Sequence, residues 1–67
     1  MYEDDEVNEG DMITWEESKL DGRVRVIHEG EVVVINDENE VTVKSFDFDR
    51  LIDVSVYDIL TINGKEV

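Results

Sequence analysis

Short runs of β-branched residues between polar turns are the feature that most limits how this chain can fold. Residues 23–27 and 41–45 alternate apolar and polar side chains, and residues 32–35 form an uninterrupted apolar run. Alternation with a period of two indicates half-buried strands, and an uninterrupted run indicates a strand that is central or covered on both faces. No segment keeps helical spacing for three turns, and the valine, isoleucine and threonine content favours strands. The sequence therefore predicts an all-β fold.

The predicted strands follow one another at the short spacing of a small antiparallel sheet. They cover residues 12–16, 23–27, 32–35, 41–45, 54–56 and 59–62. Polar residues 28–31 and 36–39 are predicted to connect the apolar run to its neighbours, and residues 46–51 to form a wide turn or a short helical turn. The Asn-Gly dipeptide at 63–64 favours a two-residue hairpin turn, after which residues 65–67 would pair with the last strand.

The length of the chain limits its core. A single domain of 67 residues buries only about 60% of the surface that its unfolded chain exposes. Because the chain has no cysteine, neither disulfides nor a thiolate zinc site can supplement this core, and aliphatic burial must suffice. We expect Trp15 and Phe46 in the core, with Val24 and Val26 directed inward. Five or six short strands bury such a core when their antiparallel sheet is strongly bent or closes into a small barrel, which also limits exposed edges.

Acidic residues dominate the charge of the chain, with 19 Asp and Glu against 6 Lys and Arg and a net charge of -13. Such a field excludes sequence-independent binding to nucleic acid or to an anionic membrane, so the partners should be basic proteins or cations. Residues 1–10 contain five acids and predict a flexible acidic arm ahead of one domain at residues 11–67. The acidic N-terminus and the lack of about 18 consecutive apolar residues argue against a signal peptide or membrane span. We therefore expect a soluble, cytoplasmic protein.

No catalytic or cofactor site is predicted. His28 is the only histidine, and without a nucleophile or second titrating group held near it, we interpret it as a turn histidine among acids. The serines lack a G-x-S-x-G elbow, so nucleophilic catalysis has no support. Residues 47–58 match part of a calcium-binding EF-hand loop, but Leu51 and Ile52 replace a ligand and the glycine of its sharp turn. We expect no enzyme activity, no cofactor and no metal centre, with weak surface calcium binding as an alternative.

Three segments of the chain carry a resemblance to a known class of fold. They are Gly10-Asp11-Met12-Ile13-Thr14-Trp15, Leu20-Asp21-Gly22-Arg23-Val24-Arg25-Val26 and Val32-Val33-Val34. This pattern resembles the KOW-type and SH3-like barrels, in which a G-D-x-V opening strand is followed by G-x-V and a strand that ends in apolar residues. The resemblance covers residues 10–45 and implies a small SH3-like barrel. Many members of that class bind RNA or ribosomes through basic loops, which this sequence lacks.

The acids of the predicted domain gather in its turns, whereas Arg23 and Arg25 share one outward strand face. A net charge of magnitude about 2–8 suffices for solubility, so -13 points to a further role. Thirteen phosphates span about 22 Å of B-DNA, close to the diameter of roughly 28 Å expected for a domain of this length. The candidate partner-binding carboxylates, which would stand in for phosphates, are Glu29, Glu31, Asp37, Glu38, Glu40, Asp47, Asp49 and Asp53, with Glu3, Asp4, Asp5 and Glu6 of the arm as an auxiliary group.

Small, highly acidic, cysteine-free chains with no enzyme signature resemble the DNA-mimic inhibitors that bacteriophages make to disable host DNA-binding proteins. Within that group, short acidic phage proteins similar to this one target the nucleoid protein HU. The resemblance implies a competitive inhibitor, in the cytoplasm of the host cell, whose carboxylates occupy the DNA-binding surface of a basic protein.

An alternative function is a small SH3-like adaptor that binds a protein partner without DNA mimicry. Such an adaptor would bind through a groove or through the strand edge at residues 32–35, with weak salt dependence. The same strand edge is a candidate dimer contact.

Overall fold

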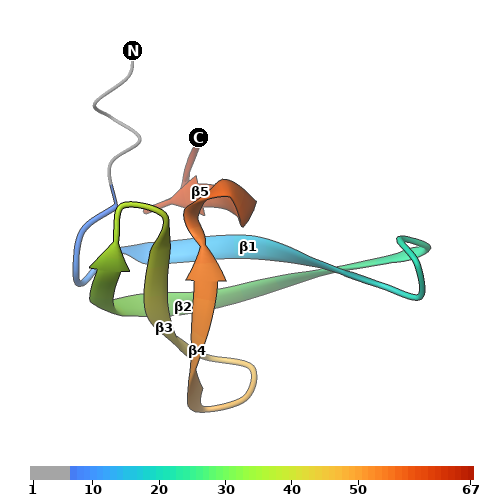
Figure 1. The fold of residues 1–67 in the computed structure, drawn as a ribbon, viewed down its shortest axis with the longest axis horizontal. Coiled ribbons are helices and arrows are strands. Elements are labelled where there is room, and N and C mark those ends of the chain that lie inside the picture. The colour runs from blue at the N-terminus through green and yellow to red at the C-terminus, as the bar shows by residue number, and fades with distance from the viewer. Residues whose placement is uncertain (1–6) are drawn as a thin grey trace.

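The computed structural model describes residues 7–67 and shows six antiparallel strands in one sheet (Figure 1). Within these residues the strand order is β4-β3-β2-β1-β5-β6, so the outermost strands β4 and β6 do not pair with each other. The all-β prediction is confirmed in the form of a strongly bent, open sheet. The elements are β1 (Met12–Lys19), β2 (Val24–Asp37), β3 (Glu40–Ser45), β4 (Arg50–Ser55), the 3-10 turn η2 (Val56–Asp58), β5 (Ile59–Ile62) and β6 (Lys65–Glu66).

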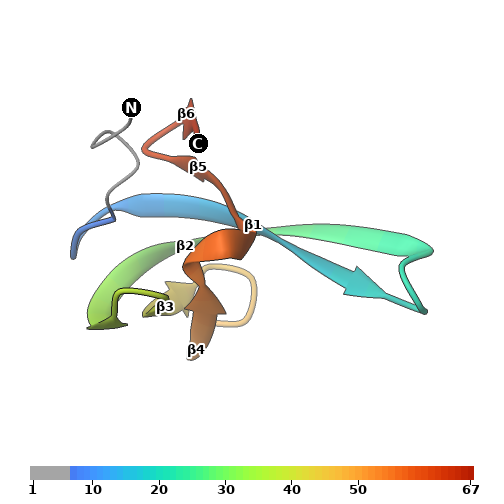
Figure 2. The same ribbon diagram turned by 45° about the horizontal axis from the view of Figure 1, so that its top comes forward.

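The long strand β2 produces the bend, because it belongs to two pairings at once. It pairs with β1 over residues 24–31 and with β3 over residues 30–37. The register with β3 shifts between Val32 and Val34, and such irregularities increase the local twist and bend a strand. Strands β3 and β4 consequently lie across the direction of β1 and β2, as Figures 1 and 2 show.

The continuity of β2 shows that the turn predicted at residues 28–31 is wrong. Gly30 is a strand residue at a close approach of two strands: a Cβ atom there would lie 2.5 Å from the backbone oxygen of Lys44 and 2.6 Å from a methyl group of Val43. The two strands predicted on either side of Gly30 are therefore one element. The apolar run at 32–35 lies in β2, an interior strand of the sheet, as its uninterrupted apolar character predicts. The strand edge considered for an adaptor or a dimer contact therefore does not belong to an outermost strand.

Eight buried hydrophobic side chains from five strands form the core on the inner face of the sheet. The core residues of β1 and of β3 share this face because alternate residues of a strand point to the same side. Trp15 is in the core, as predicted, whereas Phe46 is 49% exposed because it lies in the turn after the last inward residue of β3, Ser45. The core residues are Ile13, Trp15, Val32, Val41, Val43, Val54, Ile59 and Ile62.

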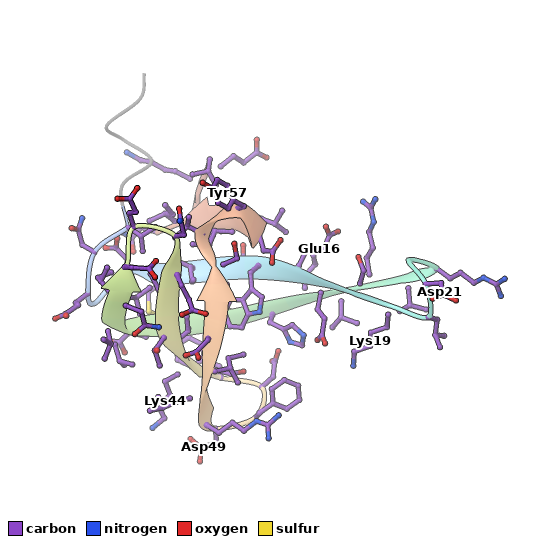
Figure 3. The ribbon with its side chains drawn as sticks, viewed as in Figure 1. Glu16, Lys19, Asp21, Lys44, Asp49 and Tyr57 are labelled. Carbon is purple, nitrogen blue, oxygen red and sulfur yellow. The ribbon has the colours of Figure 1, made fainter. Side chains whose placement is uncertain are left out.

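The outer halves of β1 and β2 form a two-stranded ribbon that extends past the rest of the sheet (Figures 1 and 3). Pairing continues to Lys19 opposite Val24, and a tight turn at residues 20–22, with positive φ at each residue, closes the hairpin. Val26 is half-buried and Val24 is exposed, so the predicted inward valines lie beyond the core. Half of the Lys and Arg residues of the chain lie near the end of this ribbon: Lys19, Arg23 and Arg25.

Both ends of the described chain are fixed to the sheet by backbone hydrogen bonds. The N–H of Gly10 donates to the carbonyl of Val32 over 2.8 Å, and Val7 packs against the core. Residues 7–10, predicted to belong to a flexible arm, are therefore part of the domain. The hairpin turn at 63–64 joins β5 to β6 as predicted. No helix in residues 7–67 is long and apolar enough to cross a membrane.

Replacing Gly30 by alanine should lower the free energy of unfolding by about 1–3 kcal/mol, because the added methyl group overlaps the backbone of β3. Urea unfolding followed by tryptophan fluorescence measures this loss. Glu31→Ala, at the exposed neighbouring position, is the control and should stay within about 0.5 kcal/mol of the wild type. Equal midpoints for Gly30→Ala and the wild type would contradict the close approach of β2 and β3.

Candidate functional site

The outer face of the sheet, opposite the core, carries acidic side chains from β1 to β4. Glu29 and Glu31 of β2 are exposed on this face, while the residues between and beside them are buried on the inner face. Strand pairing places Glu29 opposite Thr14, and Glu31 between Met12 and Lys44. We call the outer side of the bent sheet the acidic face and define it by the outward acids Glu16, Glu29, Glu31, Glu40 and Asp53. Because the sheet is bent, the first three lie on the β1–β2 layer and the last two on the β3–β4 layer.

The carboxylates of the acidic face repeat along β2 at a regular interval. A strand rises about 3.3–3.4 Å per residue, so Glu29 and Glu31 are about 6.7 Å apart along β2. Glu16 of β1 lies opposite Ile27 and continues the same row by one step. One strand of B-DNA has a phosphate per about 3.4 Å of its axis, so this row holds one carboxylate for every two phosphates.

Two cations lie among these acids, and both form ion pairs. Arg25 Nε lies 3.5 Å from Glu16 Oε2, and Lys44 Nζ lies 3.6 Å from Asp49 Oδ1. Figure 3 shows Lys44 and Asp49 together at the end of β3 and β4. Solvent screens such pairs because at least one side chain of each pair is largely exposed. With five carboxylates and two cations, the acidic face remains negative.

Asp37 and Glu38 lie at the turn between β2 and β3, next to one end of the acidic face. The carboxylate of Asp37 accepts a hydrogen bond from the backbone N–H of Asn39 at 2.6 Å, which stabilises this turn. Within the face, Thr42 donates its hydroxyl to Asp53 over 2.8 Å. These bonds fix the positions of the carboxylates at this end of the sheet.

Asp47 and Asp49 lie at the opposite end of β3, in the turn that joins β3 to β4. The candidate acids therefore do not all converge: six belong to the acidic face or its adjoining turn, and these two do not. Both contact basic side chains of the chain itself: Asp49 pairs with Lys44, and Asp47 with the imidazole of His28. The auxiliary acids Glu3, Asp4, Asp5 and Glu6 lie outside the described residues.

His28 lies in the middle of β2 and is buried, which corrects its interpretation as a turn histidine. Its Nδ1 lies 2.9 Å from Asp47 Oδ2, and its Nε2 lies 2.9 Å from Glu17 Oε1. The rings of Trp15 and Phe48 pack beside it, with centroids 5.6 and 5.4 Å away. The hydrogen bond with Asp47, helped by Glu17, raises the pKa of His28 above its ordinary value of 6.5, although burial opposes the charged form.

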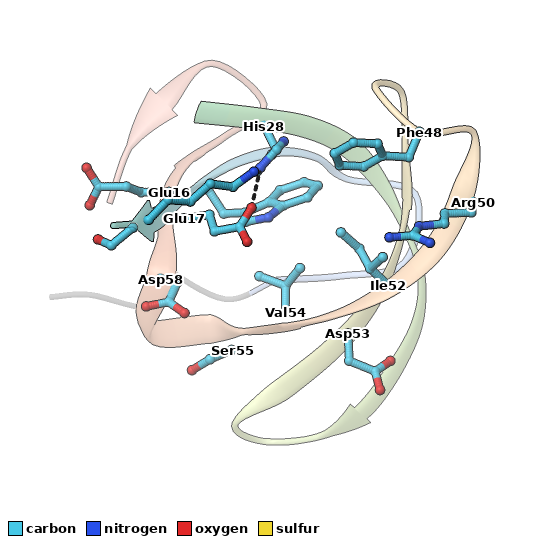
Figure 4. Close-up of a pocket in the computed structure, with 13 residues that line it drawn as sticks. Glu16, Glu17, His28, Phe48, Arg50, Ile52, Asp53, Val54, Ser55 and Asp58 are labelled. Carbon is cyan, nitrogen blue, oxygen red and sulfur yellow. Dashed lines mark hydrogen bonds and ion pairs between the residues drawn. The ribbon is translucent and has the colours of Figure 1, made fainter. Parts of the chain in front are cut away.

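A groove of about 770 Å³ lies between the ribbon and β4 (Figure 4). Trp15 and Val54 supply its apolar part, and Glu17, joined to His28 by the dashed line, lines the ribbon side. On the other side, the guanidinium carbon of Arg50 lies 5.4 Å from the centroid of the Phe48 ring. The volume is that of a typical ligand site, but the lining mixes apolar groups with charges of both signs.

The candidates for chemistry in the sequence are His28 and the acids of residues 47–58. Both ring nitrogens of His28 contact carboxylates, so neither is available to act on a substrate in this arrangement. Residues 47–58 form a turn, a strand and η2, so their acids do not converge as in a calcium-binding loop. Among residues 7–67, no group of three or more His, Asp or Glu side chains is placed to hold a metal ion.

The predicted site omits two acids that the structure makes prominent, Glu16 of the acidic face and Glu17 beside His28. The alternation in residues 12–16 places Glu16 on the polar side of its strand, so the sequence contains this signal. The contact between Glu17 and His28 depends on the register of β1 with β2. No local pattern specifies that register, and the turn wrongly predicted at 28–31 conceals it.

No family model, curated protein or solved structure matches this chain.

Salt should stabilise this protein. Its net charge is -13, and the excess carboxylates repel one another in the compact folded state. Raising sodium chloride from about 10 mM to about 1 M shortens the Debye length from about 30 to 3 Å and should add on the order of 1 kcal/mol to the free energy of unfolding. Urea unfolding at each salt concentration measures the effect. The gain should shrink in the variant Glu29→Gln/Glu31→Gln; a loss of stability with salt would show that ion pairs outweigh the repulsion.

Proposed function

We propose that this protein is a DNA mimic that binds the DNA-binding surface of a basic protein and competitively blocks its binding to DNA. The observation that carries the proposal is the acidic face, which holds five carboxylates from four neighbouring strands and only two cations. A basic surface that binds phosphates through Lys and Arg would pair with these carboxylates in the same way.

The size and rigidity of the domain support this proposal. Its extents are 33 × 27 × 21 Å, and thirteen phosphates, one for each unit of net charge, occupy about 22 Å of B-DNA. The acids of the acidic face are attached to paired strands, so their backbone positions are fixed before binding. Such preorganisation reduces the conformational entropy lost on association.

A nucleoid protein of the HU class is the first partner to test, because this chain resembles the phage inhibitors that target HU. The chain would then act in the cytoplasm of a host cell. Neither nucleic acid nor an anionic membrane would bind the acidic face directly, since both carry the same sign of charge.

Fluorescence anisotropy of a labelled DNA duplex bound to purified HU-class protein tests the competition. Adding this protein should release the duplex, and the inhibition should weaken steeply with salt, because exposed charges are screened over about 8–10 Å at physiological ionic strength. Glu29→Gln/Glu31→Gln should weaken inhibition about tenfold, or about 1.4 kcal/mol. Lys44→Gln, which removes a cation from the acidic face, should strengthen it.

Asp21→Asn/Glu66→Gln provides the matched control. It changes the net charge by the same two units, but Asp21 lies at the ribbon turn and Glu66 in β6, away from the acidic face. Equal weakening by both double variants would mean that net charge alone governs inhibition. Failure to displace the duplex at any concentration would contradict mimicry toward this partner, and capture of a partner that DNA cannot displace would contradict it altogether.

The groove between the ribbon and β4 favours a second candidate, an adaptor that binds a protein segment without mimicking DNA. Phe48 is half-exposed at the groove and is better suited to test this than Trp15, whose loss would damage the core. Phe48→Ala should abolish binding by an adaptor and leave DNA competition unchanged. Binding that is insensitive to salt would favour the adaptor.

A further inference from the structure

His28 lies where three parts of the chain meet. The ring belongs to β2, Glu17 reaches it from the β1 side of the ribbon, and Asp47 reaches it from the β3–β4 turn. The His28 side chain is 4% exposed, whereas those of Glu17 and Asp47 are 51% and 48% exposed. A buried imidazole thus bridges two half-exposed carboxylates.

The two contacts determine how many protons the imidazole carries. A neutral imidazole has one N–H donor and one bare nitrogen, whereas the imidazolium has two donors. Ionised carboxylates only accept, so two contacts of 2.9 Å from the two ring nitrogens are satisfied together only by the imidazolium. A neutral ring would turn a nitrogen lone pair toward a carboxylate oxygen in a buried place, which is unfavourable.

We propose that His28 is a proton-operated latch: its imidazolium holds Asp47 of the β3–β4 turn against the ribbon, and loss of one proton releases Asp47 and the adjoining Phe48. The base of the turn stays in place, because the N–H of Phe46 donates to the carbonyl of Glu29 in β2 over 2.9 Å. Asp47 is the carboxylate released, because Glu17 lies on a strand that pairs with β2 and stays in place. Phe48 follows Asp47 in the chain, packs on the imidazole and lines the groove. Release of the latch therefore also changes the opening of the groove.

The charged groups that face His28 from the elements packed against it are Glu17 and Asp47, while Trp15 and Phe48 contribute aromatic rings. Arg50 of β4 packs on Phe48, and as an exposed cation it opposes the imidazolium only weakly. The other charged residues that line the same groove are Glu16, Lys19, Asp53 and Asp58.

The direction of the pKa shift sets the pH range of the latch. Because the pKa of His28 is raised above 6.5 in the folded chain, the two contacts stabilise the fold fully below pH 6.5 and lose their effect as pH rises through the folded value. The chain has one histidine and no cysteine. His28 is therefore the one side chain whose ordinary pKa lies near this range.

Long-range ¹H–¹⁵N NMR of the imidazole over a pH titration tests the latch in the wild-type protein. We expect two protonated ring nitrogens at about pH 6, a midpoint above 6.5, and resonances of residues 46–49 that shift with the same midpoint. A neutral ring at about pH 6 or a midpoint at or below 6.5 would overturn the proposal. Turn resonances that do not follow the histidine would also overturn it.

Two isosteric variants separate the contributions of Asp47 and Glu17 to the pKa of His28. Asp47→Asn should lower the pKa of His28 toward 6.5 by more than Glu17→Gln does, because the hydrogen bond with Asp47 is the larger cause of the shift. Asp49→Asn, in the same turn but paired with Lys44, is the control and should leave the midpoint unchanged. An unchanged midpoint in Asp47→Asn contradicts the latch. The titration of the wild-type protein gives a result even if a variant fails to fold. That result does not depend on whether the protein mimics DNA.

Discussion

The shared strand β2 is the constraint on which the rest of the structure depends. It holds the ribbon through β1 and the β3–β4 layer through β3, and both pairings overlap at Gly30 and Glu31. Gly30 permits β3 to approach closely, and the irregular register after Val32 bends the strand. The inner side of this bend encloses the core, and its outer side presents the carboxylates of β2. Core and acidic face are therefore two sides of the same strand.

The second constraint is the balance between a small core and a large charge. Eight buried hydrophobic side chains oppose the repulsion of a net charge of -13. The chain does not relieve this repulsion evenly. Asp47 and Asp49 at the β3–β4 turn have basic partners in His28 and Lys44, whereas Glu29 and Glu31 lie side by side on one face. Local neutralisation stabilises a turn, and the uncompensated charge is left on the sheet surface, where a basic partner can reach it.

The sequence predicts the strands of this protein better than their connections. Alternation and β-branching identify β3 and β5, and the Asn-Gly dipeptide identifies the last hairpin, because each depends on local preferences. Gly30 is misread as a turn residue, because the position requires glycine for a close contact with β3, and β3 is distant in sequence. Phe46 is misplaced for a similar reason, since β3 ends one residue before it. The charge predicts an acidic surface. Which acids lie on the acidic face and which lie in the turns can be predicted only when the register of the sheet is known.

The arrangement of the acids matters more for the proposed mimicry than their number. A flexible acidic chain would lose conformational entropy on binding, whereas the outward acids here are attached to paired strands at a fixed spacing. That spacing gives one carboxylate for every two phosphates along β2, so the acidic face is sparser than a DNA strand. Neighbouring strands lie only about 4.7–4.9 Å apart, and their register decides what lies beside the row: Thr14 beside Glu29, and Met12 and Lys44 beside Glu31. The density of charge that a partner would meet is therefore set by the packing of strands across the sheet, and a change in register would alter it without changing the composition.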